Sequence, residues 1–216
     1  SRLARIQCGG RGVEDDALPG GPRLRDELAR RRRELPRRRA AVHRDGRDLR
    51  EQAGDIEPVA PLFAAEKYAD RDDATFAPGE GAAWVIGWFE HAVPSESFVN
   101  LIPTVAGGTH ESGLRAGVFD AVKSFIEHHA LLPRGVKLQQ HDVAGRMSFV
   151  LSARLLDPQF QGQVKEKLNS REAVKLVSTM IRDPFEIWLN NHVEAGRAIA
   201  ELSIKQALAR QKSAQK

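Results

Sequence analysis

An alternating run over residues 147–156 constrains the fold of this chain more than any other stretch. Apolar side chains occupy every second position, and the positions between them mix apolar and polar residues. A period of two predicts a half-buried β-strand. Pro158 cannot donate to a sheet ladder, so we expect the strand to stop at Asp157. Helical periodicity begins after Ser170, a favourable N-cap residue, and predicts a helix over 170–182.

The loop between this strand and this helix carries an amide, Gln163, and an ammonium group, Lys165, just after Gly162. A lysine is a compact, mobile charge suited to a phosphate. An extended loop with this spacing can aim both side chains at one anionic ligand. The stretch has no phosphate-binding fingerprint, and any surface loop can hold a lysine. Spacing alone therefore leaves both interpretations open.

The same periodicities predict two more strands, at about 83–90 and 97–103, and a helix at about 110–130. We expect the two strands to be antiparallel neighbours. Together these elements predict an α+β fold with a mostly antiparallel sheet and helices on one face. Trp84 and Trp88 share one face of the first strand and could stack nucleic-acid bases. Nothing basic lies between them, which favours a place in the core under a helix.

The C-terminal part of the chain predicts a long helix over 184–216, separated from the preceding helix by Pro184. Its tail is basic, and Lys205, Arg210 and Lys212 are candidate contacts to DNA phosphates. A solvated helix end explains the same residues equally simply. No cluster of histidines, cysteines and acids has the spacing of a metal site, so we expect no metal.

Charge is distributed unevenly along the chain. Residues 1–50 hold 15 Arg, no Lys and 8 acidic residues, hence +7, and the rest hold 18 basic and 21 acidic residues, hence −3, which sums to +4. Residues 1–46 have no aromatic residue and no apolar period, so they cannot offset their ordering entropy. We interpret them as a disordered arginine-rich arm that binds phosphates by charge, or as a stretch translated out of frame.

The single cysteine, Cys8, excludes an internal disulfide and fits the cytoplasm. No apolar run approaches the roughly 18 residues of a membrane span, so we expect no membrane contact.

Four blocks follow one another at characteristic spacing: FVNLIPT at 98–104, GGTHESGLR at 107–115, LLPRGVKL at 131–138, and DPQF leading into QVK at 157–165. Together they resemble the transducer domain of bacterial type IIA topoisomerase B subunits, and the last two blocks favour topoisomerase IV over gyrase. The resemblance covers about residues 47–216. It implies a transducer similar to domain 2 of ribosomal protein S5, with a long C-terminal helix.

In that family, the last block reaches the γ-phosphate of ATP held in a neighbouring GHKL domain. The resemblance therefore implies that Gln163 and Lys165 contact this phosphate, while Val164 stands where the family usually has threonine. The GHKL motifs and their catalytic glutamate do not occur in this sequence. We accordingly expect no catalytic residue here and no ATP hydrolysis by this chain alone. His110 and Glu111 in the second block are interpreted as structural.

The resemblance also implies a function for the complete protein: coupling ATP binding and hydrolysis to DNA strand passage. Its cofactor would be ATP with Mg²⁺, with none bound by this chain alone. Its partners would be DNA, the A subunit of topoisomerase IV and a second B subunit joined through the ATPase domain, in the cytoplasm at the bacterial nucleoid. Three alternatives remain. They are a gyrase B transducer, a stand-alone S5-like nucleic-acid-binding module without catalysis, and an inert fragment.

Overall fold

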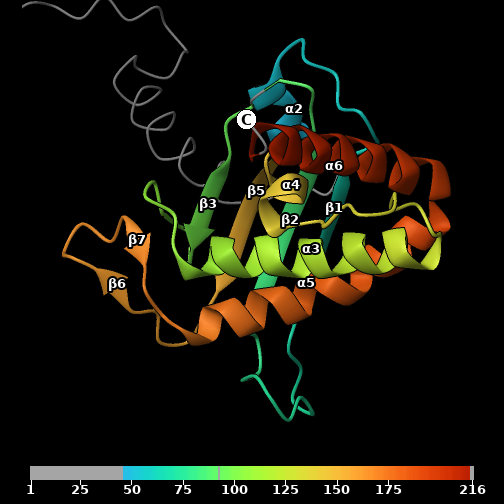
Figure 1. Cartoon of the computed structure of the whole chain (residues 1–216). Helices are drawn as coiled ribbons and strands as arrows, with labels where there is room; N and C mark the ends of the chain where they lie inside the picture. Colours follow the sequence, from blue (N-terminus) through green and yellow to red (C-terminus); the bar gives the residue numbers. More distant parts are fainter. Residues whose placement is uncertain (1–45, 92, 215–216) are drawn as a thin grey trace, which may run out of the picture. The chain divides into compact units, whose positions relative to one another are not determined.

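The computed structural model describes residues 46–91 and 93–214 (Figure 1). The arm predicted for residues 1–46 lies outside these ranges, apart from Gly46. The strands are β1 (Phe63–Tyr68), β2 (Gly81–Trp88), β3 (Glu96–Val99), β4 (Ile102–Pro103), β5 (Met147–Arg154), β6 (Phe160–Gln161) and β7 (Lys167–Leu168). The helices are α2 (Arg47–Ala53), α3 (Thr109–His128), α4 (Gln140–Ala144), α5 (Glu172–Asn191) and α6 (Val193–Ala214).

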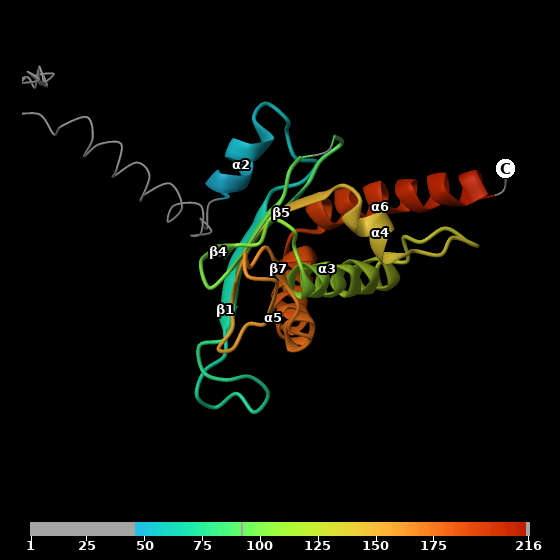
Figure 2. The same ribbon diagram turned by 90° about the vertical axis from the view of Figure 1, so that its left-hand side faces the viewer.

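Five strands form one sheet in the order β1-β2-β5-β3-β4, and β6 and β7 form a separate hairpin. β2 and β5 run antiparallel at the centre, with Trp84 opposite Leu151 and Ile86 opposite Phe149. Every residue of β2 is buried because helices cover both faces. α3 and α5 pack on one face and the short α2 on the other (Figure 2). The predicted α+β class is confirmed, and α2 adds a layer on the face that the prediction left bare.

The predicted pairing between strands 83–90 and 97–103 is wrong. β5 lies between β2 and β3, and β3 runs parallel to β5. A parallel pair needs a crossover connection, which α3 and α4 provide here. The segment predicted as one strand is itself a hairpin that turns at Asn100 and Leu101, whose φ angles are 49° and 68°. Positive φ at both turn residues is typical of a two-residue hairpin.

The face of the sheet under α3 and α5 holds the larger core. Trp84 and Trp88 are 0% and 2% exposed there, as the core interpretation predicted, so neither ring is open to a nucleic-acid base. The Trp88 ring stacks on Phe185 of α5, with centroids 5.7 Å apart and planes 7° apart. Its indole Nε1 donates to the Val143 carbonyl at 3.0 Å, so the polar end of this buried ring is satisfied.

The expected separation of two helices at Pro184 is also wrong. α5 continues through Pro184 to Asn191, and the break falls at His192, before α6. Proline inside a helix costs about 3 kcal/mol. Helical spacing of buried residues nevertheless crosses it, and Phe185, fully buried, packs against Phe63 with ring centroids 4.9 Å apart. Tertiary burial of this aromatic residue offsets the local cost of the proline.

None of the helices within the described residues combines the length and apolar character that crossing a membrane requires.

Candidate functional site

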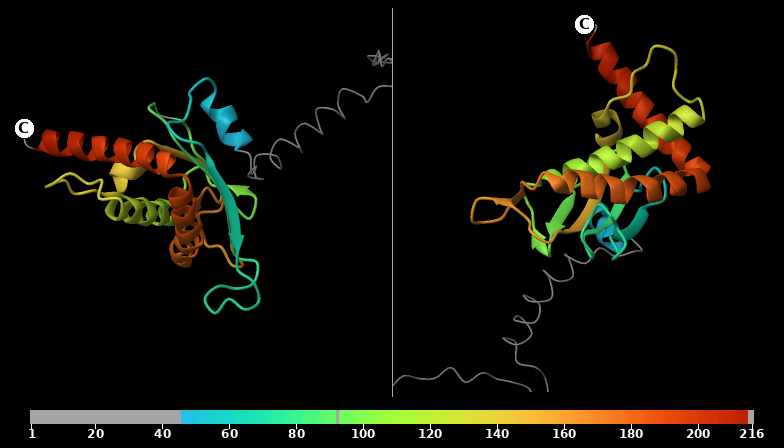
Figure 3. Two further views of the ribbon diagram at one scale, coloured as in Figure 1. Left: turned by 90° about the vertical axis from the view of Figure 1, so that its right-hand side faces the viewer. Right: turned by 90° about the horizontal axis from the view of Figure 1, so that it is seen from below.

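Gln163 and Lys165 lie together at the tip of the β6–β7 hairpin. Phe160 pairs with Leu168 across the stem, and residues 162–166 form the connecting loop. The hairpin projects beyond the sheet and the helices, as two views agree (Figures 1 and 3). The sequence placed these two groups two residues apart on a loop, and the structure places that loop on a defined two-stranded stem.

Both tip side chains are exposed, and the backbone turns sharply around them. Gly162 has a φ of 74° and Lys165 a φ of 58°. The Lys165 Nζ lies 5.9 Å from the Phe160 ring centroid, at the outer limit of a cation–π contact. Within residues 46–91 and 93–214, neither Gln163 nor Lys165 forms a hydrogen bond or ion pair. The ammonium group is therefore accessible to a ligand or to another domain. The Val164 side chain between the two residues is also accessible, since it is 77% exposed.

The β7 side of the stem is fixed to the turn that precedes α3. The Leu168 amide donates to the Gly107 carbonyl at 3.0 Å, and the Ala106 amide donates to the Glu166 carbonyl at 3.0 Å. Leu168 itself is fully buried. A Cβ on Gly108 would lie 2.4 Å from the Leu168 carbonyl oxygen, so only glycine allows this approach. These contacts give the tip a rigid base.

The β6 side of the stem is fixed by two polar side chains. The Asn100 amide pairs with both backbone groups of Leu155, donating to its carbonyl at 2.8 Å and accepting from its N–H at 3.0 Å. β5 ends at Arg154, earlier than the predicted Asp157. The prediction that Ser170 caps the next helix is wrong, because its Oγ instead accepts from the Gln159 amide at 2.8 Å.

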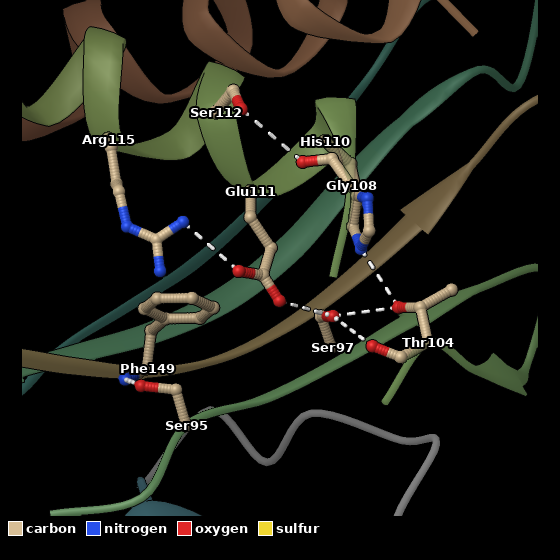
Figure 4. Close-up of polar contacts among 9 residues, drawn as sticks. All are labelled: Ser95, Ser97, Thr104, Gly108, His110, Glu111, Ser112, Arg115 and Phe149. Atoms are coloured by element: carbon tan, nitrogen blue, oxygen red, sulfur yellow. Dashed lines mark hydrogen bonds and ion pairs between the residues drawn. The ribbon is translucent and has the colours of Figure 1, made fainter. Parts of the chain in front are cut away.

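A polar network lies beneath the turn (Figure 4). Ser97, Thr104 and His110 are buried in it, and Glu111 and Arg115 are partly exposed. The Ser97 hydroxyl lies 2.7 Å from the Thr104 hydroxyl and 2.8 Å from the Glu111 carboxylate. Thr104 Oγ1 lies 3.0 Å from His110 Nε2, and Arg115 Nη1 donates to Glu111 at 3.0 Å. The network thus joins β3, the turn and the start of α3, in agreement with the structural role expected for His110 and Glu111.

The direction of these bonds follows from the carboxylate at one end. Glu111 can only accept, so Ser97 donates to it and must accept from Thr104, which in turn accepts from His110 Nε2–H. This assignment places a proton on His110 Nε2, and the other ring nitrogen, Nδ1, is buried without a partner among the described residues. Burial lowers the pKa of His110 from 6.5 to about 4, which keeps the ring neutral at physiological pH.

Neither Ser97 nor Asn100 was a predicted site residue, although both lie within or beside the FVNLIPT block. Their partners, Glu111 and Leu155, are 14 and 55 residues away. The only local signal for these two residues was their position, because Ser97 precedes and Asn100 follows the apolar pair Phe98 and Val99.

The three candidate DNA contacts all lie on α6, but they are not equivalent. Lys205 and Lys212 are exposed and border a shallow hollow of about 500 Å³, whose lining also includes Glu201. Arg210 instead binds Asp142, with Nε–Oδ1 and Nη2–Oδ2 distances of 3.0 and 2.9 Å. The structure therefore does not assemble the three charges into one basic surface.

The described residues contain no group of three or more His, Cys, Asp or Glu side chains that could hold a metal ion.

Comparisons with known proteins find similar sequences and a similar fold. The family model for DNA gyrase B matches residues 51–216. The B subunit of DNA topoisomerase 4 from Pseudomonas aeruginosa is 50% identical over 139 residues, which cover 63% of this chain and 22% of that protein. The chain therefore spans about a fifth of the length of this curated relative.

Two solved structures are also similar. The topoisomerase IV ATP-binding domain of Francisella tularensis aligns with a TM-score of 0.58 and 35% identity, covering 67% of this chain and 39% of that one. The 43K ATPase domain of Thermus thermophilus gyrase B aligns with a TM-score of 0.66 over 77% of this chain and 43% of that one. Its identity of 19% supports the fold alone.

Proposed function

The chain belongs to the DNA gyrase B family and carries the transducer domain of a type IIA topoisomerase B subunit, and from this premise we propose that its β6–β7 hairpin contacts the γ-phosphate of ATP. The nucleotide would be held in an ATPase domain outside residues 51–216. Lys165 would donate to the phosphate from a charged ammonium group and Gln163 from a neutral amide. The observation that carries this proposal is the exposure of both side chains at the tip of a firmly anchored hairpin.

The chain's own residues would convert phosphate loss into movement. Lys165 would contact the terminal phosphate before hydrolysis and lose that contact afterwards, so its interaction energy differs between the two states. The stem is hydrogen-bonded to the turn before α3, through Gly107 and Ala106. Displacement of the tip would therefore carry the sheet and helices along as a rigid body.

We propose the setting that the family resemblance implies: a topoisomerase IV that uses ATP with Mg²⁺ and passes one DNA duplex through another. Its partners would be DNA, the A subunit of that enzyme and a second B subunit, in the cytoplasm at the nucleoid. The 50% identity to a topoisomerase 4 relative supports topoisomerase IV over gyrase. No catalytic group is assigned to this chain, and we expect no ATP turnover from the 216-residue chain alone.

The test uses a chimera, the Pseudomonas aeruginosa topoisomerase 4 B subunit in which the aligned 139-residue segment of this chain replaces its counterpart. Lys165→Ala should lower kcat for ATP hydrolysis and strand passage by about 100-fold, the typical effect of removing one preorganised charge-stabilising contact. Nucleotide binding should remain largely intact, because the substitution leaves the ATPase domain that holds the nucleotide unchanged. Gln163→Ala should have a smaller effect, since it removes a neutral donor.

Lys167→Ala is the matched control, because Lys167 is exposed on the same hairpin and carries the same charge, but it lies in the stem opposite Gln161. Its turnover should equal that of the unsubstituted chimera. Equal losses of turnover in Lys165→Ala and Lys167→Ala would mean that the positive charge of the hairpin matters and not a specific contact of Lys165. Unchanged turnover in Lys165→Ala would remove Lys165 from this role.

A further inference from the structure

The stem of the hairpin depends on one short turn for its position. The Gly107 amide donates to the Thr104 carbonyl at 2.8 Å and closes that turn. Two further bonds, from Ala106 to the Glu166 carbonyl and from Leu168 to the Gly107 carbonyl, fix the stem to it. Glu166 directly follows Lys165 in the chain. The hydrogen bond from Ala106 therefore holds the hairpin backbone at the residue next to Lys165.

The turn and the stem are in direct backbone contact. A Cβ added at Gly108 would lie 2.7 Å from the Leu168 nitrogen and 2.4 Å from its carbonyl oxygen. No flexible side chain separates the two segments. Any shift of the turn must therefore move β7, and with it the tip.

Thr104 fixes this turn from two sides. Its backbone N–H donates to the Ser97 carbonyl at 2.9 Å, which continues the β3–β4 pairing. Its hydroxyl lies between the Ser97 hydroxyl and His110 Nε2. Thr104 and His110 are 2% and 0% exposed, so water cannot replace either bond. The turn is thus fixed to the sheet through Ser97 and to the first turn of α3 through His110.

We propose that Thr104 and His110 are positioning residues for Lys165, holding the hairpin where its ammonium group can reach the γ-phosphate. This inference rests on the proposed function of Lys165. It adds that the tip is connected to α3 through the turn and the bond between Thr104 and His110. Thr104→Val removes the hydroxyl with little change of shape, whereas Thr104→Ser retains it, and the pair separates the hydrogen bonds from simple packing.

The first experiment measures amide hydrogen exchange in the 216-residue chain. Thr104→Val should accelerate exchange at Leu168 and Ala106 by about tenfold, the effect of losing one buried hydrogen bond from a local opening. Thr104→Ser should restore slow exchange. Amides of the α3–α5 core, such as Leu114 and Val177, should keep their protection in both variants. Unchanged exchange at Leu168 in a folded Thr104→Val chain overturns the inference, whatever Lys165 does.

The second experiment measures ATP turnover in the same chimera. Thr104→Val should lower kcat about 10- to 100-fold, the effect expected when a reacting group is misplaced by about 1 Å, with nucleotide affinity unchanged. Thr104→Ser should recover most of the loss. In the double variant with Lys165→Ala, turnover should be no lower than in Lys165→Ala alone, because both changes remove the same contact.

The outcomes separate the two proposals. If Lys165→Ala has no effect, the proposed function fails, and the exchange data still decide whether the turn positions the hairpin. Suppose instead that Lys165→Ala suppresses turnover, and that the double variant loses as much as the product of the Thr104→Val and Lys165→Ala effects. The proposed function of Lys165 then stands, and the positioning role of Thr104 is wrong. Should Thr104→Val fail to fold, Ser97→Ala breaks the same chain of hydrogen bonds one link away, and the same exchange and turnover results decide.

Discussion

Arg210 on α6 forms a two-point ion pair with Asp142 on α4, with distances of 3.0 and 2.9 Å. The Asp142 side chain is 1% exposed and that of Arg210 is 27% exposed. Arg210 also donates to the Lys137 carbonyl at 2.8 Å. One guanidinium therefore fastens the C-terminal half of α6 to the loop and helix that precede β5. Its geometry is that of a structural contact, because the Nε and Nη2 donors are bound within the chain and the charge is paired with the Asp142 carboxylate.

Arg210→Ala should lower the Tm of the chain by a few degrees at pH 7, since it leaves the buried Asp142 carboxylate without its guanidinium partner. Calorimetry measures this, with Lys212→Ala as the control because Lys212 is exposed on the same helix. Equal Tm values for the two variants would contradict a structural role for Arg210.

The same pair should make stability depend on pH in the acid range. Burial by itself raises the pKa of Asp142, but the hydrogen bonds from Arg210 and the Gln139 amide outweigh it, so the pKa lies below its ordinary 3.8. A lowered carboxyl pKa contributes stability that is complete above the unfolded value and is lost as pH falls through the folded value. The difference in Tm between Arg210→Ala and the unsubstituted chain should therefore shrink below about pH 4.

His110 should produce a pH dependence in a higher range. Burial of its ring lowers the pKa from 6.5 to about 4, so below pH 6.5 the unfolded chain binds a proton that the native chain excludes. Stability should accordingly fall as pH is lowered from 6.5 to 4, by on the order of 3 kcal/mol, and should not depend on this group above pH 6.5. Urea unfolding at a series of pH values measures the slope.

His110→Gln removes the titrating group while retaining an amide that can donate toward Thr104, so it should flatten the slope between pH 6.5 and 4. His128→Gln is the matched control, because His128 is exposed at the end of α3 and should leave the slope unchanged. An undiminished slope in His110→Gln would assign the titration to another residue.

Gly117→Ala should destabilise the chain by about 1–3 kcal/mol, the usual cost of overpacking, even though alanine is the better helix former. A Cβ at Gly117 would lie 2.6 Å from the Ser178 carbonyl oxygen on α5, and backbone there cannot move aside without separating α3 from α5. The urea midpoint reports the change.

Asp120→Ala on the same helix gains similar helix propensity, but its side chain is exposed, and it should stay within about 0.5 kcal/mol of the unsubstituted chain. A Gly117→Ala chain as stable as this control would mean that the two helices are not in close backbone contact.

Helical and strand periodicity located most elements because it records which side chains face the core locally. The strand predicted at 83–90 is β2, the helix predicted at 110–130 is α3, and the exposed tip carries Gln163 and Lys165 as expected for a loop. The resemblance of four short blocks identified the family, which the match over residues 51–216 confirms. The phosphate contact itself remains a prediction.

The helical spacing of Ile181, Phe185 and Leu189 was a local signal for a helix through Pro184, but the prediction gave more weight to the proline. Strand order and the partner of Arg210, by contrast, were not accessible from local patterns. Each depends on contacts between residues distant in the chain, such as Arg210 with Asp142, 68 positions apart. The sequence by itself determined the local elements, the core face of each and the charged tip, because these follow from side-chain spacing. Only the tertiary structure decided that β5 separates β2 from β3 and that Thr104 and His110 are bonded to each other at the turn that holds the hairpin. Those arrangements arise from packing among elements, which no local pattern encodes.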